Sequence, residues 1–544
     1  MQKYINAWCE MVAILRDFIN APKIKNAFLW GFALYAIALF ALIRGDIYYI
    51  DDLQTSIVDS NWNHFSRYLG TFILNDLMTF GKGAVDSSPL LQIMAVVLAI
   101  ISSLILIYLI RGKCDLLSIV ASLPLGLSPH FLQNLSYKFE SLFMCVALFC
   151  AILPFLFKEN RRIFSAVSVI SLILMFMTYQ AANGTYIILS LYFAFSLYFL
   201  EGRSFKESAI FLAICAMNLI VATLIYRFAI AMPVSEFIIA YTSDKAFPLD
   251  RLLLGIWANL ITYLTTIFND FKNTPYIWLV ALIALLFVIN ITIRTNRPKF
   301  IAICGAILFL VFGICLSYGL YLVLEMTIFE PRVFYGFNAL IAIISIANSS
   351  RSDFLGSASS RSLQRTPSAS HSLVSHNPKN SSAILEFAPS VESAKSNTIY
   401  KIFHYASATI AVITAYFLIS FANIYGNALK KQDEYLDFRA QLLLKDLGDK
   451  VPKDSMVNLK IYLGYSAVTK RFAEKYGRIS RLVPKVAEND WFFHWRLQHF
   501  NARYNDSQEE LCDHIKQNFN SELIVKNAYH TIERVKSCYF VTIK

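Results

Sequence analysis

Long runs of apolar residues, separated by short polar segments, dominate the first 348 residues of the chain. Several of these runs reach the roughly 20 residues that an α-helix needs to cross the ~30 Å hydrocarbon core of a bilayer. The clearest predicted spans are residues 26–44, 89–110, 116–128, 141–157, 208–231, 275–293, 300–324, 333–348 and 401–422. With two further helices before and after "TYQAANG", the pattern predicts an all-α polytopic membrane protein, a helical bundle of about 11 spans.

Short basic clusters between the apolar runs predict the orientation of the bundle. The amphipathic N-terminal segment carries Lys3, Arg16, Lys23 and Lys25, so we expect it in the cytoplasm, on the membrane surface. The clusters in "RGKCD", "KENRR", "EGRSFK" and "TIRTNRPK" are also expected inside. Because a span at 251–268 would place "TIRTNRPK" outside, we expect that segment to be interfacial or re-entrant. The N-terminus is then cytoplasmic and the C-terminus external.

Composition and charge agree with this class. The chain is 56% hydrophobic and 16% charged, with a mean hydropathy of +0.50. A soluble protein of this size would carry far more charge. A net charge of +12 would suggest nucleic acid as the partner of a soluble protein, but here the basic clusters beside the spans account for it. The expected partner is therefore the lipid bilayer, and no nucleic acid.

Polarity divides the chain into four parts. Residues 1–348 form the predicted membrane domain, and residues 349–399 have the serine-rich composition of a disordered cytoplasmic linker. Residues 400–422 are the last predicted helix, and residues 423–544 are polar with many aromatic residues, which predicts a small external domain. In an external compartment Cys512 and Cys538 could form a disulfide, although two unpaired buried cysteines fit the sequence nearly as well.

Two adjacent acids, Asp51 and Asp52 in "DIYYIDDLQTS", directly follow the first predicted span. A membrane helix does not need such a pair, and ionisable groups close to a membrane point to function. The acids would lie in the first turn of an amphipathic helix on the external side. There, two nearby carboxylates can divide the roles of general base and orienting group. A solvated acid pair at a helix end is the structural alternative.

Further polar groups gather on the same external side. Arg332 in "FEPRVFYG" and Lys138 in "LSYKFES" could bind a phosphate, although a Lys or Arg that extends to the membrane surface is the plain alternative. Gln180 in "MTYQAANG" is of a type that commonly contacts sugars, but such residues also close helix ends. The other candidates for donor or substrate binding on this side are Arg67, Tyr137, Glu140 and Glu330.

Motifs of several other classes are missing from the sequence. There is no GxxxxGK[ST] or GxGxxG segment, so nucleotide energy is not expected to be used directly. There is no HExxH or cysteine metal site, and we expect no cofactor, although an acid pair could hold a divalent metal. A transporter or flippase for a lipid-linked or charged solute is the main alternative function. It would need polar groups at the membrane midplane, and few are present.

Four segments together carry a resemblance to a known family. They are "DDLQTSIVDSNWNHFSRYLGTFI", "LSPHFLQNLSYKFESLFMCVALFCAILPFL", "YQAANG" and "PRVFYG", all within residues 25–348. In this order they resemble the Gtr-type (family II) glucosyltransferases that modify bacterial O-antigen. The resemblance implies a membrane glycosyltransferase of the GT-C type that uses a polyprenyl-phosphate sugar. It also implies a site at the outer face of the bacterial inner membrane and a periplasmic C-terminal domain.

The resemblance assigns roles to individual residues. Asp51 and Asp52 occupy the family's acidic catalytic positions, and Lys138 and Arg332 match basic positions that would bind the donor phosphate. Arg67 in "SRYLG" matches an arginine that the family has near "GRP", where this chain has Tyr68. The implied reaction transfers a hexose, glucose by resemblance, to O-antigen or another lipopolysaccharide glycan. A sugar-phosphate synthase and a flippase are then the expected protein partners.

Overall fold

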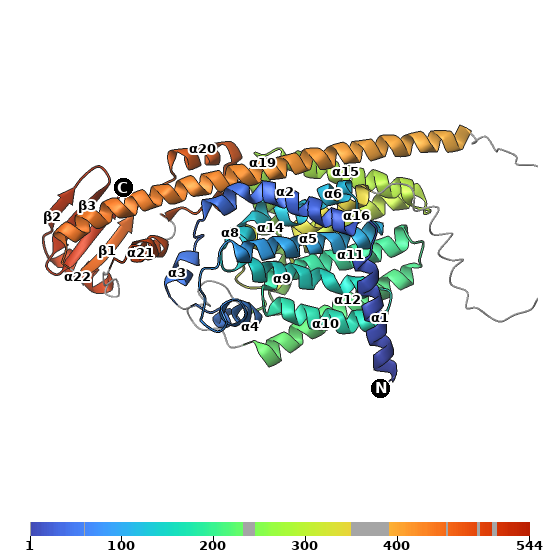
Figure 1. Cartoon of the computed structure of the whole chain (residues 1–544), viewed down its shortest axis with the longest axis horizontal. Helices are drawn as coiled ribbons and strands as arrows, with labels where there is room; N and C mark the ends of the chain where they lie inside the picture. Colours follow the sequence, from blue (N-terminus) through green and yellow to red (C-terminus); the bar gives the residue numbers. More distant parts are fainter. Residues whose placement is uncertain are drawn as a thin grey trace, which may run out of the picture.

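The computed structural model describes residues 2–58, 60–231, 245–349, 391–452, 455–486, 490–502 and 509–544. Most of the expected serine-rich linker, residues 350–390, lies outside this described chain. The described residues form a bundle of helices, and one long helix leads from it to a small domain at the C-terminus (Figure 1). The expected fold class is confirmed: a helical membrane protein with a small C-terminal domain.

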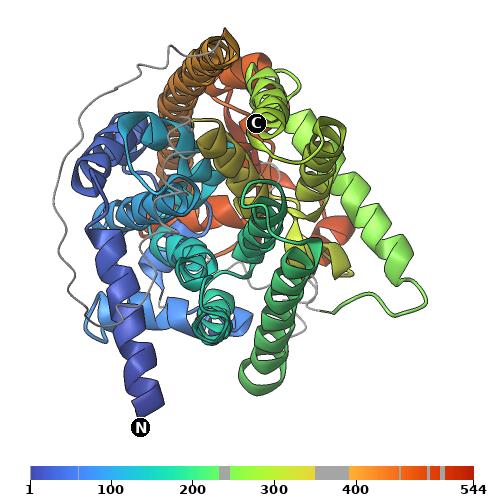
Figure 2. The ribbon, with the colours of Figure 1, turned by 90° about the vertical axis from the view of Figure 1, so that its right-hand side faces the viewer.

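Eight helices of the described chain are long and apolar enough to cross a membrane. They are α2 (Ile24–Gly45), α5 (Leu90–Arg111), α11 (Asn183–Phe199, preceded by the turn Gln180–Ala182), α12 (Phe205–Ile225), α14 (Leu252–Phe271), α15 (Tyr276–Arg294), α16 (Lys299–Leu316) and α19 (Val391–Lys450). Figure 2 views several of them end-on. Large apolar side chains such as Leu253, Trp278 and Phe300 are exposed on their outer sides, as a lipid environment favours.

The other helices of the bundle are shorter. α6 (Leu116–Ser122) and α7 (Pro124–Leu127) lead into α8 (Pro129–Ser136) with a bend of 65°. The single span expected at 116–128 is therefore part of a bent pair, because Ser128 caps a new helix and Pro129 has no N–H to continue the previous one. α9 (Ser141–Ile152), α10 (Arg161–Phe176) and α17 (Tyr335–Asn348) are too short to be counted. The described chain thus has eight candidate spans, or nine with the bent pair, against about 11 expected.

α14 is long and apolar enough to span, whereas the sequence predicts an interfacial or re-entrant segment at 251–268. In the middle of α14, the Asn259 amide donates to the carbonyl of Leu324, which follows α16. Near its C-terminal end, Asp270 accepts a hydrogen bond from Arg481 of the C-terminal domain. Both parts of α14 therefore contact segments at the same end of the bundle, an arrangement that an interfacial helix would have.

The clusters expected in the cytoplasm lie together at the opposite end of the bundle, which we call the basic end. Asn160 of "KENRR" donates to Glu10 of α1 (Gln2–Ile19) at 2.8 Å, and Arg297 of "TNRPK" donates to the carbonyl of Arg203 at 2.7 Å. α1 runs across this end, transverse to the bundle helices (Figure 1). The cations that define the basic end are Lys23, Arg111, Lys113, Lys158, Arg203 and Arg297.

Two glycines explain why the segments "YQAANG" and "PRVFYG" both lie at the start of a helix. Gly184 in α11 and Gly336 in α17 both contact the carbonyl oxygen of Ser317, and a Cβ added to either would lie only 2.3 Å or 2.2 Å from it. A side chain at either position would force the three backbones apart. This close packing fixes the residues four positions upstream, Gln180 and Arg332, at one end of the bundle.

A continuous helix joins the bundle to the C-terminal domain. α19 has 60 residues, which corresponds to about 90 Å at 1.5 Å per residue. It does not end near residue 422, where the sequence predicts the end of the last span. Beyond the bundle, Leu436, Leu443 and Leu447 of α19 belong to the buried core of the C-terminal domain. The helix is thus a structural element of both parts (Figure 1).

The C-terminal domain contains a four-stranded sheet that the sequence analysis does not predict. The strands β1 (Met456–Ile461), β2 (Glu522–Lys526), β3 (His530–Val535) and β4 (Cys538–Ile543) lie in the order β1-β4-β3-β2, with β1 parallel to β4 and the other pairs antiparallel. α20 (Ala467–Tyr476), α21 (Asp490–His499) and α22 (Glu509–Asn518) complete it. A disulfide joins Cys512 to Cys538, so the first of the two alternatives for these cysteines is the one found.

Candidate active site

The loop between α2 and α3 (Asp52–Ile57) has a strained backbone. α2 ends at Gly45, and both Asp46 and Ile50 have positive φ, 51° and 49°. A β-branched residue rarely adopts this conformation, because its side chain crowds the backbone. Strain of this kind persists only where surrounding contacts hold it, and it is frequent at functional sites. Ile50 directly precedes Asp51, so the acid pair lies at the end of the strained loop.

Asp52 holds two segments of the chain together. Its buried carboxylate accepts hydrogen bonds from the backbone N–H groups of Tyr49 (3.0 Å), Lys138 (2.9 Å) and Phe139 (3.3 Å). Burial and the adjacent Asp51 raise the pKa of Asp52, and the three N–H donors oppose that rise. Because both oxygens face backbone donors, Asp52 fixes the loop against the turn between α8 and α9.

Asp51 lies in a different environment from its neighbour. Its Oδ1 atom is buried and has no hydrogen-bond partner within the described chain. Burial and the Glu140 carboxylate raise the pKa of Asp51 to about 7, against the opposing charges of Arg332 and Arg67. A carboxylate with an unoccupied acceptor atom and a pKa near neutrality is suited to take a proton from a hydroxyl group.

Arg332 is held from both sides of its backbone. Its N–H donates to Gln133 Oε1 at 2.8 Å, and its carbonyl accepts from Asn134 Nδ2 at 3.1 Å. The guanidinium donates to the hydroxyl of Tyr137, which is buried against Tyr49. α8 therefore supplies the two residues that place Arg332 close enough to Asp51 to influence its pKa.

Arg67 reaches the same site from the short segment before α4 (Tyr68–Thr71). Its Nε donates to Gln180 Oε1 at 3.3 Å, and its guanidinium stacks 4.7 Å from the centre of the Tyr179 ring. The Gln180 amide in turn donates to the carbonyl of Phe65 at 3.1 Å and to the hydroxyl of Tyr226 at 3.0 Å. Gln180 thus orients Arg67. The sugar contact expected of Gln180 stays a prediction.

Glu140 is buried beside Asp51 and accepts a hydrogen bond from the indole N–H of Trp62. The structure therefore brings together five of the predicted site residues, three that act on the Asp51 carboxylate and two that hold its arginines. They are Arg67, Tyr137, Glu140, Gln180 and Arg332, with Asp51 at the centre.

Lys138 is placed differently from its predicted role in phosphate binding. Its side chain is 3% exposed, and its ammonium pairs with Asp46 at 2.7 Å and Asp86 at 3.1 Å, above the ring of Tyr48. Burial lowers the pKa of Lys138, but the two acids outweigh burial and raise it. The Lys138 ammonium is thus paired with two carboxylates, and the backbone N–H of Lys138 donates a hydrogen bond to Asp52.

Glu330 contacts the C-terminal domain, where sequence analysis found no candidates. Its carboxylate lies 3.4 Å from Arg481 Nη1, and Arg481 also forks onto the buried Asp270 at 3.1 and 2.9 Å. His130 contacts the same carboxylate at 3.0 Å. Asp270 is the single acidic residue in the apolar segment 252–271, and this could have marked it in the sequence. Nothing in the local sequence marks Arg481.

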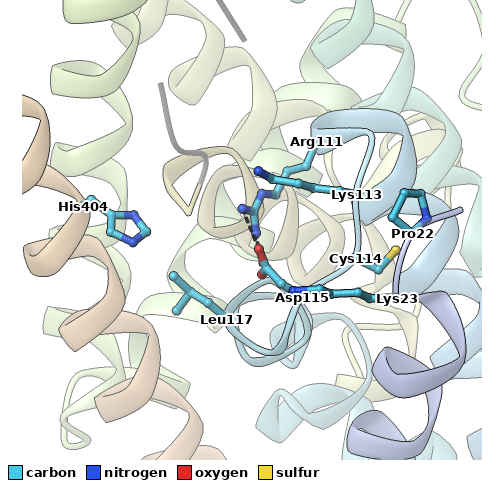
Figure 3. A pocket seen from close by; sticks show the side chains of 8 residues that line it. All are labelled: Pro22, Lys23, Arg111, Lys113, Cys114, Asp115, Leu117 and His404. Carbon is cyan, nitrogen blue, oxygen red and sulfur yellow. Dashed lines mark hydrogen bonds and ion pairs between the residues drawn. The ribbon is translucent and has the colours of Figure 1, made fainter. Parts of the chain in front are cut away.

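A cavity of about 250 Å³ at the basic end is separate from this site. Its lining includes Lys23, Lys113 and His404, and Arg111 there pairs with Asp115 at 2.8 Å (Figure 3). The cavity thus joins the N-terminal basic segment to the "RGKCD" cluster, two of the clusters that the charge pattern assigned to one side. Among the described residues, no group of three or more His, Cys, Asp or Glu side chains could hold a metal ion.

Comparison with known proteins gives three findings. A family model described as Glucosyl transferase GtrII matches residues 39–343, more than half of the chain. An "Uncharacterized 55.3 kDa protein in gtrB 5'region" of Salmonella phage P22 is 27% identical over 181 residues. That match covers 33% of this chain and 37% of the relative's own length. No solved structure matches the chain.

The matched residues include Asp51 and the groups around it, and they exclude Arg481 and the whole C-terminal domain. The resemblance seen in the four sequence segments is confirmed. The chain belongs to the glucosyl transferase GtrII family.

Proposed function

We propose that this protein transfers glucose from a polyprenyl-phosphate donor to a hydroxyl group of an O-antigen or related lipopolysaccharide glycan. The observation that carries the proposal is the Asp51 carboxylate. Its Oδ1 is buried without a hydrogen-bond partner in the described chain, and its pKa is raised to about 7 beside two guanidinium groups. A base next to two cations suits a hydroxyl that attacks a sugar carrying a phosphate.

Asp51 takes the proton from the acceptor hydroxyl as the hydroxyl oxygen bonds to the anomeric carbon of the donor. The bond between that carbon and the phosphate oxygen breaks, and the polyprenyl phosphate leaves with both electrons. Arg332 and Arg67 stabilise the negative charge that gathers on the phosphate in the transition state. Since Asp52 is occupied by three backbone donors, no second carboxylate of the pair is available as a nucleophile. Direct displacement follows, with inversion at the anomeric carbon.

The site is proposed to face the periplasm, with the basic end in the cytoplasm. The basic clusters lie at the end of the bundle opposite Asp51, as the positive-inside rule favours. The disulfide between Cys512 and Cys538 supports an oxidising compartment for the C-terminal domain. A donor made in the cytoplasm must then be supplied by a sugar-phosphate synthase and moved across the membrane by a flippase.

The test is transfer in membrane vesicles that lack the sugar-phosphate synthase, with radiolabelled polyprenyl-phosphate glucose as donor and lipid-linked O-antigen as acceptor. UDP-glucose serves as the control donor, and the Asp51→Asn variant as the control protein. We expect label in the glycan from the lipid donor alone, and only with the unaltered protein. Label from UDP-glucose, or equal transfer by Asp51→Asn at equal protein level, would contradict the proposal. Movement of the lipid donor across the vesicle without transfer would favour a flippase instead.

A further inference from the structure

The short helical turn Gly477–Leu482 of the C-terminal domain packs against the bundle beside the candidate site. Within it, Arg481 makes hydrogen bonds to two separate parts of the bundle. Its Nε and Nη2 bind the two oxygens of Asp270 at 3.1 and 2.9 Å, and its Nη1 donates to the carbonyl of Phe329 at 2.9 Å. One guanidinium thus joins α14 to the residues just before Arg332.

The receiving site for Arg481 is built into the bundle. The Asp270 side chain is fully buried, and His130 of α8 contacts its Oδ2 at 3.0 Å. The His130 ring packs against Phe271 and Phe334. A buried carboxylate needs a partner that supplies charge and hydrogen bonds together, and the planar fork of arginine supplies both. This contact is therefore too specific to be a chance touch between two domains.

The next residue of the same turn reaches the other side of the site. The carbonyl of Leu482 accepts a hydrogen bond from the hydroxyl of Tyr49 at 2.8 Å. Gln133 donates to that same hydroxyl at 3.2 Å, and its Oε1 accepts from the backbone of Arg332 at 2.8 Å. Two consecutive residues of the C-terminal domain thus contact the segments that carry the proposed base and the proposed phosphate ligand.

We propose that Arg481 is a positioning residue, by which the C-terminal domain fixes the Phe329–Arg332 turn and so places the Arg332 guanidinium at the donor phosphate. The inference rests on the proposed function of the site. It assigns a part in the reaction to a domain outside the region that the family match covers. The bundle alone holds Arg332 through Gln133 and Asn134, and Arg481 adds a second restraint at Phe329, three residues before Arg332.

A double-mutant cycle with full-length protein in membranes tests the inference. The variants are Arg481→Met, Arg332→Met and the two combined, assayed with the radiolabelled lipid donor. If Arg481 acts through Arg332, Arg481→Met lowers kcat/KM by about 10-fold or more alone, and by less than about 3-fold when Arg332 is already absent. An equal factor in both backgrounds would mean that Arg481 acts only through general stability, and would overturn the inference.

Arg478→Met is the matched control. Arg478 lies in the same turn and approaches the same Asp270 oxygen, at 3.6 Å, but it is half exposed. We expect transfer within about twofold of the unaltered protein. If Arg481→Met does not accumulate, Arg481→Lys replaces it, because a lysine keeps the charge without the fork and must show the same dependence on Arg332. Unchanged transfer with Arg481→Met would refute only this inference, whereas absent transfer with unaltered protein would refute the proposed function.

Discussion

Acidic side chains at the two ends of the bundle have different kinds of partners. At the basic end, Arg111 forks onto Asp115, four residues further along the chain, and Asp115 also caps α6. At the site end, Asp52 accepts from backbone groups 86 and 87 residues away, and Asp51 keeps a buried oxygen without a partner in the described chain. A local pair such as Arg111–Asp115 completes a helix end, whereas a buried oxygen without a partner, such as Asp51 Oδ1, is costly to fold and points to chemistry.

The largest expected effect is the loss of transfer activity when the acid at the site end is replaced, compared with the matched change at the basic end. We expect Asp51→Asn to lower kcat/KM for transfer by about 10²- to 10⁴-fold, since an amide cannot act as the base. The matched change at the basic end, Asp115→Asn, should leave transfer within about twofold, because asparagine also caps helices. Both are measured per folded protein in membranes. Equal losses at the two ends would mean that Asp51 and Asp115 do not differ in their contribution to transfer.

The second prediction compares two cations of the site end. Arg332→Met should lower kcat by about 10²- to 10³-fold, because a donor that stabilises the leaving phosphate is lost. Lys138→Met should mainly lower thermal stability, since the Lys138 ammonium already pairs with Asp46 and Asp86. Parallel melting and transfer measurements separate the two effects. A larger kinetic loss for Lys138→Met would restore Lys138 as the phosphate ligand.

The third prediction concerns pH. Burial and Glu140 raise the pKa of Asp51 to about 7, so below that pH the carboxyl group is mostly protonated and cannot accept a proton. The value of kcat/KM should therefore rise with pH, by about fivefold from pH 6 to pH 7, and then level off. Arg332 lowers this pKa, so Arg332→Met should move the remaining activity profile to higher pH. A profile that is flat between pH 5 and 8 would exclude Asp51 as the base.

The smallest effect on transfer is expected at the basic end. Asp115 accepts from Ser118 N and closes a capping box at the start of α6. Asp115→Ala removes this cap and also the partner of the buried Arg111, so it should lower the free energy of unfolding by about 3 kcal/mol, with kcat/KM unchanged. Thermal melting in detergent and transfer in membranes measure the two quantities. A loss of transfer without a loss of stability would show that the basic end is coupled to the site.

The sequence predicts the features that depend on local pattern. Apolar length identifies the spans, basic clusters identify one end of the bundle, and the motifs ending in Gly184 and Gly336 mark where three backbones meet. It also singles out Asp51 and Asp52, whose catalytic role stays a prediction. That Asp52, and not Asp51, is the acid held by backbone donors was not predictable, because two of these donors follow α8, far along the chain.

Other features escaped prediction for similar reasons. The acids that hold Lys138 come from two different loops, so its sequence neighbours could not reveal them. The predicted helix 116–128 ends at the bend, but the sequence pattern does not reveal that a second helix, α8, continues from Pro129. The contact of Arg481 with Asp270 joins residues 211 positions apart, and no local pattern specifies such a pair.

The length of α19 fixes how the C-terminal domain is rotated relative to the bundle. A helix turns by about 100° per residue and rises 1.5 Å. Because α19 runs unbroken from the bundle into the core of the C-terminal domain, one inserted residue past the bundle would swing the sheet about a quarter-turn and carry Arg481 away from Asp270. Seven inserted residues would nearly restore the facing direction but lift the domain by about 10 Å. The number of residues in this helix is therefore as much a part of the site as the residues that touch it.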